Sequence, residues 1–156
     1  MSTIITARDL TKNYGDLVAV KGVSFDIQEG ECFGFLGPNG AGKTTTVKMI
    51  HCVSPLTSGS LLVDGMVANI DNRKIKALCG VIPQEINLDT DLTVRENLMV
   101  FARFFDIPRA EARSRIAELL KFVELEAKRD AKIDQLSTGM KRRLLVARAL
   151  LNKPRF

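Results

Sequence analysis

Residue types that cross-link a chain or bind metals are scarce in this sequence. Its 156 residues include three cysteines and one histidine, and the cysteines form no C-x-x-C pair. Disulfide frameworks and zinc sites need such residues at short, regular spacings, so neither is expected here, and a reducing cytosol is the expected environment. His51 has no thiols or carboxylates at ligand spacing around it, so we expect a structural or surface role for it.

Long hydrophobic runs are also missing. No stretch approaches the ~18 apolar residues of a membrane-spanning helix. Residues 1–6 lack both a basic region and a long apolar run, so we expect no secretory signal. Hydrophobic residues make up 46% and charged residues 26% of the chain, which excludes disordered and fibrous classes. The length fits one domain of ordinary size.

Charge is unevenly distributed. Residues 1–102 carry 9 Lys and Arg against 11 Asp and Glu, whereas residues 103–156 carry 14 against 7. A basic C-terminal third is compatible with binding to nucleic acid, with binding to an acidic partner, or with a helical surface that only contacts solvent. Because its basic residues alternate with Glu and Asp through 109–130, the pattern favours a solvated helical surface.

The first half of the chain has the pattern of an α/β protein. The expected strands are 4–10, 17–27, 31–36, 60–63 and 79–82, and the expected helices are 43–52 and 71–78. The strands at 31–36 and 79–82 are strongly apolar, which is typical of buried strands. Asp64 and Gly65 indicate a hairpin turn after 60–63.

From residue 84 the pattern becomes helical. Thr93 and Glu96 form a capping box at the start of one helix, and Pro108 suits the first turn of the next. A last helix is expected from about 138 to 152, with Ser137 as its N-cap.

One loop carries a phosphate-binding pattern. The run Gly37-Pro38-Asn39-Gly40-Ala41-Gly42-Lys43-Thr44 matches G-x-x-x-x-G-K-[ST], and it joins an expected strand to an expected helix. Glycines allow positive φ, so that consecutive N–H groups can approach phosphate oxygens. The helix N-terminus adds partial positive charge. Lys43 supplies a full charge for the β- and γ-phosphates, and Thr44 a hydroxyl for Mg²⁺. Thr45 offers a second hydroxyl. The loop predicts binding of a nucleoside phosphate.

Three segments in this order carry a family resemblance. GPNGAGKTTT at 37–46, VIPQE at 81–85 and LSTGMKRRL at 136–144 resemble the nucleotide-binding domain of ABC transporters, and the M-K-R-R-L ending is similar to ATPases of drug and lipo-oligosaccharide exporters. The resemblance implies an α/β P-loop NTPase (RecA-like) core with an N-terminal antiparallel β portion and a helical subdomain. It implies a β-rich and P-loop core part at 1–85, a helical subdomain at 86–140, and a signature helix at 141–156 that leads back to the core.

The same resemblance assigns residue roles. Gln84 corresponds to a glutamine that contacts Mg²⁺ and the attacking water, and Tyr14 to an aromatic residue that stacks on adenine. Ser137 and Gly139 belong to a signature that closes over the nucleotide of a second, head-to-tail copy. Thr138 and Met140 depart from the usual L-S-G-G-Q signature, which puts the tightness of that pairing in question.

Cofactors, partners and location also follow from the resemblance. It implies ATP and Mg²⁺ as cofactors, a transmembrane permease as partner, a homodimer on ATP binding, and a place on the cytoplasmic face of the membrane without nucleic acid. The family continues past its signature helix with an Asp-Glu pair and a histidine. Because this chain ends at Phe156, we expect it to lack the C-terminal part of the domain and to be nearly inactive alone.

Three other functions are compatible with the motifs. Some relatives in the family are soluble ATPases that act on ribosomes or nucleic acid, and the basic C-terminal third fits such a role. A different P-loop class, such as a kinase or a GTPase, would need its own acceptor or base-reading motif, and none is visible. The chain could also be a nucleotide-binding module without catalysis.

Overall fold

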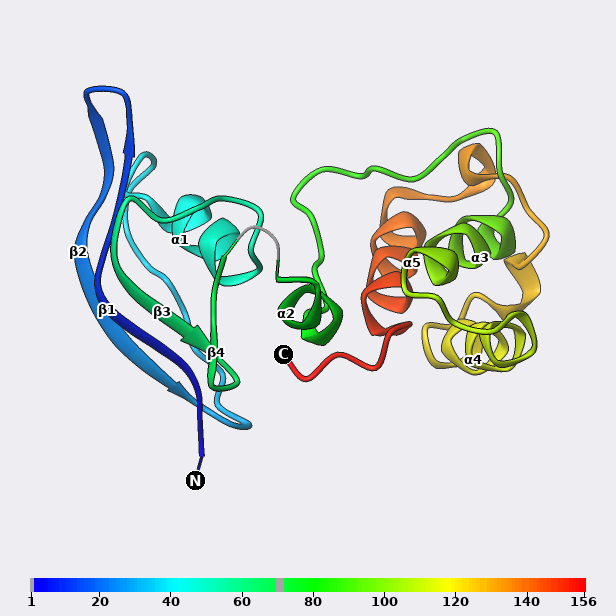
Figure 1. Cartoon of the computed structure of the whole chain (residues 1–156). Coiled ribbons are helices and arrows are strands. Elements are labelled where there is room, and N and C mark those ends of the chain that lie inside the picture. The colour runs from blue at the N-terminus through cyan, green and yellow to red at the C-terminus, as the bar shows by residue number, and fades with distance from the viewer. Residues whose placement is uncertain (1, 70–71) are drawn as a thin grey trace. The chain divides into compact units, whose positions relative to one another are not determined.

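The computed structural model describes residues 2–69 and 72–156. These residues form two compact units, Met1–Lys76 and Ala77–Phe156. The N-terminal unit holds the strands and the first helix, and the C-terminal unit is helical (Figure 1). This mixture of elements is the expected α/β composition.

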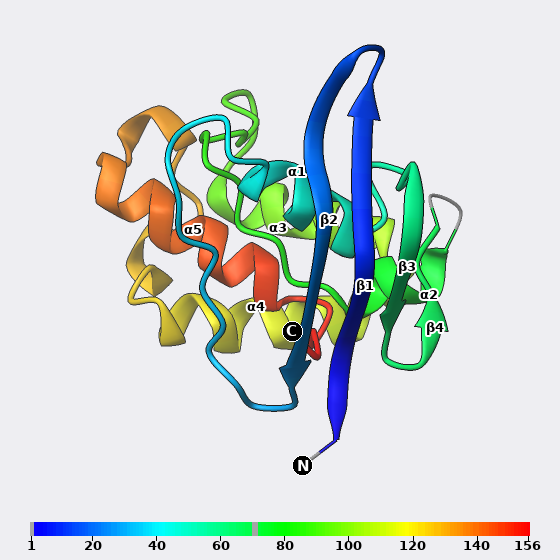
Figure 2. The ribbon, with the colours of Figure 1, turned by 90° about the vertical axis from the view of Figure 1, so that its left-hand side faces the viewer.

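The N-terminal unit is built on an antiparallel sheet with strand order β2-β1-β3-β4 (Figure 2). The strands are β1 Thr3–Tyr14, β2 Leu17–Gln28, β3 Ser58–Val63 and β4 Met66–Val67. They confirm the strands expected at 4–10 and 17–27 and the hairpin after 60–63, and β1 extends further, to Tyr14. Ile5 pairs with both Ile27 and Val63.

One face of this sheet is covered by helix α1, Lys43–Ile50 (Figures 1 and 2). Its residues Thr46, Met49 and Ile50 are buried. Along β1 the buried positions Ile5 and Ala7 alternate, and Leu10 follows after a register shift between residues 7 and 10. The bulge at this shift keeps Leu10 in the core although it is three residues after Ala7.

Two expected strands are absent from the structure. Residues 31–36 lie in no strand, and Leu36 is 96% exposed. A strand requires a neighbour for its N–H and C=O groups, and apolar character alone supplies none. Phe33 and Phe35 pack instead with Phe25, with ring centroids 5.2–5.5 Å apart.

The second missing strand is 79–82. The Gly80 N–H donates to the Phe156 carbonyl at 2.8 Å, and the Arg155 N–H donates to the Leu78 carbonyl at 2.8 Å. These bonds join two short segments of the C-terminal unit without extending into a ladder. A Cβ on Gly80 would lie 2.7 Å from the Ala149 carbonyl oxygen, so this approach requires glycine.

Helix α2, Arg73–Leu78, covers most of the helix expected at 71–78. Asp71, its expected first residue, lies outside the described residues. The Asn72 side chain accepts from the Ile75 N–H at 3.1 Å and so satisfies one free donor at the start of the helix.

Helices α3 Val94–Phe104, α4 Arg109–Phe122 and α5 Thr138–Leu150 form the C-terminal unit, with 3₁₀ turns at Glu126–Lys128 and Ile133–Gln135. Their inward faces share one hydrophobic core: Val94, Leu98, Ala102, Ala112, Ile116, Leu120, Val123, Leu125, Ile133, Leu136, Leu144, Ala147 and Leu151. Pro108 stands directly before α4. The last helix matches the expected position within two residues.

The capping box of α3 is confirmed. The Thr93 N–H donates to the Glu96 carboxylate at 2.8 Å, and the Glu96 N–H donates to the Thr93 hydroxyl at 3.3 Å. The Thr93 hydroxyl also donates to this carboxylate at 2.8 Å, and the two bonds that Thr93 donates to it lower the pKa of Glu96. The box therefore depends on an ionised carboxylate.

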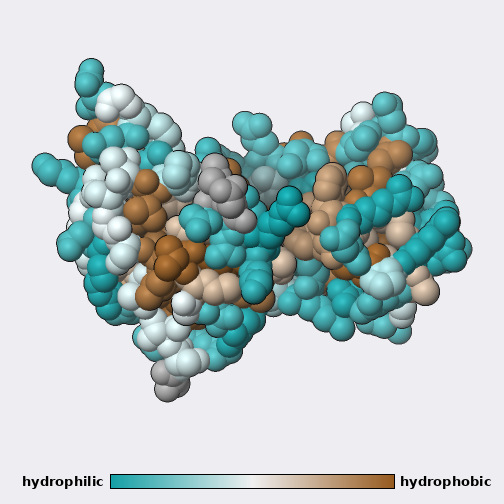
Figure 3. Space-filling model, viewed as in Figure 1, coloured by the Kyte–Doolittle hydropathy of each residue, from teal (hydrophilic) through white to brown (hydrophobic). Residues whose placement is uncertain are grey.

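Both units expose large hydrophobic side chains. In the C-terminal unit Phe104 is 77% and Phe122 71% exposed. In the N-terminal unit Leu17 is 67% and Val67 63% exposed, and Figure 3 shows hydrophobic surface over the strands on the face it draws. In the part of the chain that the structure describes, no helix is both long and apolar enough to cross a bilayer.

Candidate functional site

The loop 37–42 enters α1 through two glycines in the left-handed region. Gly40 has φ 85° and Gly42 has φ 83°. A Cβ on Gly42 would lie 2.3 Å from the carbonyl oxygen of Ala19 and 3.0 Å from the Val20 side chain. The loop is therefore packed against β2 in a way that only glycine permits, which fixes its shape before any ligand arrives.

Several N–H groups of this loop are free. Among the described residues, no acceptor bonds the N–H of Gly40, Gly42, Lys43 or Thr44. Helix α1 has no side-chain cap at its N-terminus. Where left-handed residues such as Gly40 and Gly42 precede a helix, successive free N–H groups point to the same side and form a concave anion-binding site. The loop thus fits the phosphates of a nucleotide.

Lys43 lies across this loop. Its Nζ donates to the carbonyl oxygens of Gly37 and Pro38, at 2.7 Å each. Within the described residues, no carboxylate pairs with it. An ammonium group held only by neutral carbonyls keeps its full charge available for an anion. Thr44, the next residue, is exposed, and its hydroxyl suits a hard cation such as Mg²⁺.

Tyr14 lies near the other end of α1. Its hydroxyl is 3.3 Å from Ser54 Oγ, and the Lys12 ammonium is 4.8 Å from its ring centroid. The Ser54 contact, with a smaller effect of Thr45, lowers the pKa of Tyr14. The residue is 48% exposed. The structure therefore holds Tyr14 through Ser54 and Lys12 and leaves about half of the residue exposed.

Gln84 belongs to a segment without regular structure in the C-terminal unit, and its side chain is exposed. Two arginines of α5 hold this segment. Arg142 donates to the Pro83 carbonyl at 3.2 Å, and Arg148 donates to the carbonyl and side-chain oxygens of Asn87 at 3.2 and 2.5 Å. The segment that carries Gln84 is therefore fastened to the signature helix.

Ser137 is the N-cap of α5, as expected, and its hydroxyl accepts from the Met140 N–H at 3.2 Å. Residues 137–139 are exposed. No acceptor bonds the N–H of Thr138 or Gly139 among the described residues. This helix start is a second set of free donors on which an anion can bind.

Sequence reasoning missed the residues that support these side chains. Arg148 is a half-buried cation whose guanidinium lies 5.0 Å from the Phe101 ring centroid, and burial lowers its pKa. A signal was present, because Arg148 falls at helical spacing between the buried Leu144 and Leu151. A charged residue within an apolar stripe indicates a specific partner.

Comparisons with known proteins agree with the motifs. Residues 20–156 match the family model described as ABC transporter. The chain is 49% identical over 150 residues to the Nod factor export ATP-binding protein I of Burkholderia orbicola, covering 96% of this chain and 49% of that protein. It is 44% identical to the protein of the same name from Cupriavidus metallidurans, covering 99% and 51%. The chain thus spans about half the length of these curated relatives.

Solved structures give the same result. The structure of cbiO1 from Clostridium perfringens, part of an ABC transporter complex, matches with TM-score 0.87 and 28% identity, over 99% of this chain and 63% of that one. The bacterial ABC transporter cassette MJ0796, solved as a dimer, matches with TM-score 0.82 and 34% identity, over 96% and 70%. The phosphate loop, the signature helix and these matches show that the chain belongs to the ABC transporter family.

Proposed function

We propose that this chain is the nucleotide-binding part of an ATP-hydrolysing subunit that powers an ABC exporter through a separate transmembrane permease. The observation that carries the proposal is the loop at α1, with its free N–H groups and its lysine held only by carbonyls. Relatives named as export ATP-binding proteins support the transport role. No observation favours a ribosome- or nucleic acid-directed ATPase.

Each loop residue has a role in this proposal. The backbone from Gly37 through Pro38, Asn39, Gly40, Ala41 and Gly42 surrounds the phosphates, and Lys43 places its charge on them. The Thr44 hydroxyl holds Mg²⁺, and Thr45 offers its hydroxyl to phosphate. Bound Mg²⁺ and ATP supply the phosphoryl group and a cation that offsets its charge. The protein contributes position and electrostatic stabilisation.

The remaining residues complete the site in the proposal. Tyr14 stacks on the base, because its exposed ring provides a flat surface beside α1. The amide of Gln84 can coordinate Mg²⁺ through oxygen and orient water through its N–H₂. Ser137 and Gly139 offer free donors to the nucleotide of a second copy, which agrees with the dimeric form of the cassette MJ0796. The partner copy would therefore complete each site.

The proposal also concerns catalysis by these 156 residues alone. In this proposal Lys43 and Thr44 bind the nucleotide, and none of the residues given a role above is a carboxylate that could activate water. We expect turnover well below the ordinary enzyme rate of about 1 s⁻¹.

The test is Mg·ATP affinity in the Lys43→Ala variant, with Lys48→Ala as the matched control. Both are basic residues of α1, and Lys48 lies in its last turn, away from the loop. Loss of one charge-assisted interaction predicts at least about tenfold weaker binding for Lys43→Ala and no change for Lys48→Ala. Equal affinity of the two variants would contradict the proposal. Co-purification with a multi-span membrane protein tests the transport role separately.

A further inference from the structure

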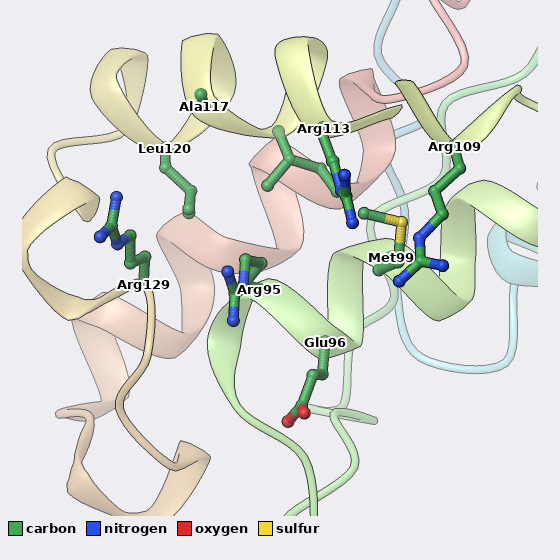
Figure 4. A pocket seen from close by; sticks show the side chains of 9 residues that line it. Arg95, Glu96, Met99, Arg109, Arg113, Ala117, Leu120 and Arg129 are labelled. Atoms are coloured by element: carbon green, nitrogen blue, oxygen red, sulfur yellow. The ribbon is translucent and has the colours of Figure 1, made fainter. Parts of the chain in front are cut away.

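A cavity of about 430 Å³ lies in the C-terminal unit, between α3 and α4. Four arginines surround it: Arg95 from α3, Arg109 and Arg113 from α4, and Arg129 after the first 3₁₀ turn (Figure 4). Its size falls within the ordinary range for small-ligand pockets. None of its residues belongs to the nucleotide site proposed above.

The charge of this cavity is only partly balanced. Asp130 pairs with Arg95 at 3.2 Å and with Arg129 at 2.9 Å. Among the described residues, the guanidinium groups of Arg109 and Arg113 have no hydrogen-bond or ion-pair partner. Glu96 also lines the cavity, but its carboxylate is bonded to Thr93 and points away from Arg113 (Figure 4). Two arginines therefore remain free to bind an anion.

The placement of these two arginines is unfavourable in the free protein. Arg109 is the first residue of α4, which has no side-chain cap, and its charge adds to the positive end of the helix dipole. Arg113 follows at i+4, where like charges repel across one turn. A bound anion would reverse both effects. The guanidinium fork matches the oxygens of a phosphate group in particular.

The floor of the cavity is apolar. Met99 and Ala117 supply its accessible apolar surface, and Ile116 and Leu120 lie behind them in the core, each 2% exposed. Methionine adapts to irregular apolar ligands. A charged rim over an apolar floor suits a molecule with one anionic end and one short hydrocarbon end. The cavity is small for a protein surface, which argues against an acidic protein segment.

We propose that this cavity binds a phosphate-bearing amphiphile, with Arg109 and Arg113 on the phosphate and Met99 and Ala117 against the apolar part. This chemistry occurs in soluble organophosphates and in anionic lipid headgroups. The proposal does not depend on the nucleotide site, because Lys43→Ala alters that site and leaves this cavity intact.

The test measures binding of hexyl phosphate to the full chain by calorimetry, with inorganic phosphate and hexanol as reference probes. We expect saturable binding of hexyl phosphate that is tighter than binding of either reference. The double variant Arg109→Gln/Arg113→Gln should bind at least about tenfold more weakly, because it loses two charge-assisted contacts.

Two further variants separate this site from general basic charge. Arg103→Gln/Lys121→Gln removes the same charge from exposed positions on α3 and α4 that do not line the cavity, and it should bind as the unmodified protein does. Ala117→Phe fills the cavity from an exposed helix position and should abolish binding with every arginine in place. This variant keeps the test decisive if the arginine variant fails to fold.

Vesicles of phosphatidylcholine with and without phosphatidic acid identify the source of the ligand. Binding to phosphatidic acid vesicles that Ala117→Phe abolishes would assign a lipid, and binding of hexyl phosphate without vesicle binding would assign a soluble organophosphate. The proposal is overturned if the two double variants lose affinity equally, or if neither hexyl phosphate nor phosphatidic acid vesicles bind saturably.

Discussion

The two units of the chain are stabilised by different kinds of contact. The C-terminal unit encloses one core formed by all three of its helices and the loops between them. The N-terminal unit has a sheet in which Leu17 and Val67 are mostly exposed, and its segment 31–36 has no strand partner. The helices of the C-terminal unit bury their apolar faces against one another. The phosphate loop depends instead on the close fit of Gly42 to β2. The most sensitive positions should therefore differ in kind between the units.

The largest effect is expected from Gly42→Ala. The new Cβ would meet the Ala19 carbonyl at 2.3 Å, and the residue would keep a φ of 83°. We expect a stability loss of about 3 kcal/mol and loss of Mg·ATP binding. Gly65→Ala is the control, since Gly65 has φ 72° but open space around it, and it should cost about 1 kcal/mol with ATP binding intact. Equal losses would mean that φ strain alone explains both.

The next effect concerns the core of the C-terminal unit. Leu144 is fully buried, and Leu144→Ala should lower the free energy of unfolding by about 3 kcal/mol in a denaturant titration. Leu36→Ala in the N-terminal unit should change it little, because Leu36 is 96% exposed. A large cost at Leu36 would show that this side chain is buried in solution, contrary to the contrast between the units.

A smaller loss of stability is expected when either of two helix N-caps in the C-terminal unit is removed. Thr93→Ala and Ser137→Ala each remove a side-chain acceptor from a helix N-terminus, and each should cost about 1 kcal/mol of stability. Under the proposed function, only Ser137→Ala should also lower the ATPase rate of the complete protein. If both variants lowered the rate equally, Ser137 would be a cap and nothing more.

The smallest effect is a pH dependence in the N-terminal unit. Burial, with smaller effects of Lys48 and Lys76, lowers the pKa of His51 below 6.5. The unfolded state therefore takes up a proton first as pH falls, and the thermal midpoint should drop between about pH 7.5 and pH 5.5. His51→Asn should drop less over the same range. Identical profiles would show that His51 contributes nothing.

Features set by local sequence were predictable. The capping box needs only Thr93 and Glu96, and the Ser137 cap needs only its own helix. The phosphate loop and the helix that follows it were also predicted, because the spacing of its glycines indicates where the backbone can take positive φ. Recognition of the family came from three motifs, and the comparisons confirm it.

Features that depend on distant partners were not predictable. The segments 31–36 and 79–82 have the composition of strands, yet strand formation requires a neighbouring chain segment that composition does not reveal. The spacing of Arg148 indicates that it has a partner, but not that the partner is Asn87, 61 residues away. Local sequence therefore predicts the candidate phosphate loop, whereas contacts between distant residues determine how the segment that carries Gln84 is held.

The central claim is that free backbone N–H groups at the start of α1 bind phosphate, and amide NMR of the full chain tests it directly. On addition of Mg·ATP, the account predicts large shifts of the Gly40, Gly42, Lys43 and Thr44 amide signals, with little change at Gly65 in the distant hairpin. Saturable ATP binding that left these four signals in place would contradict it.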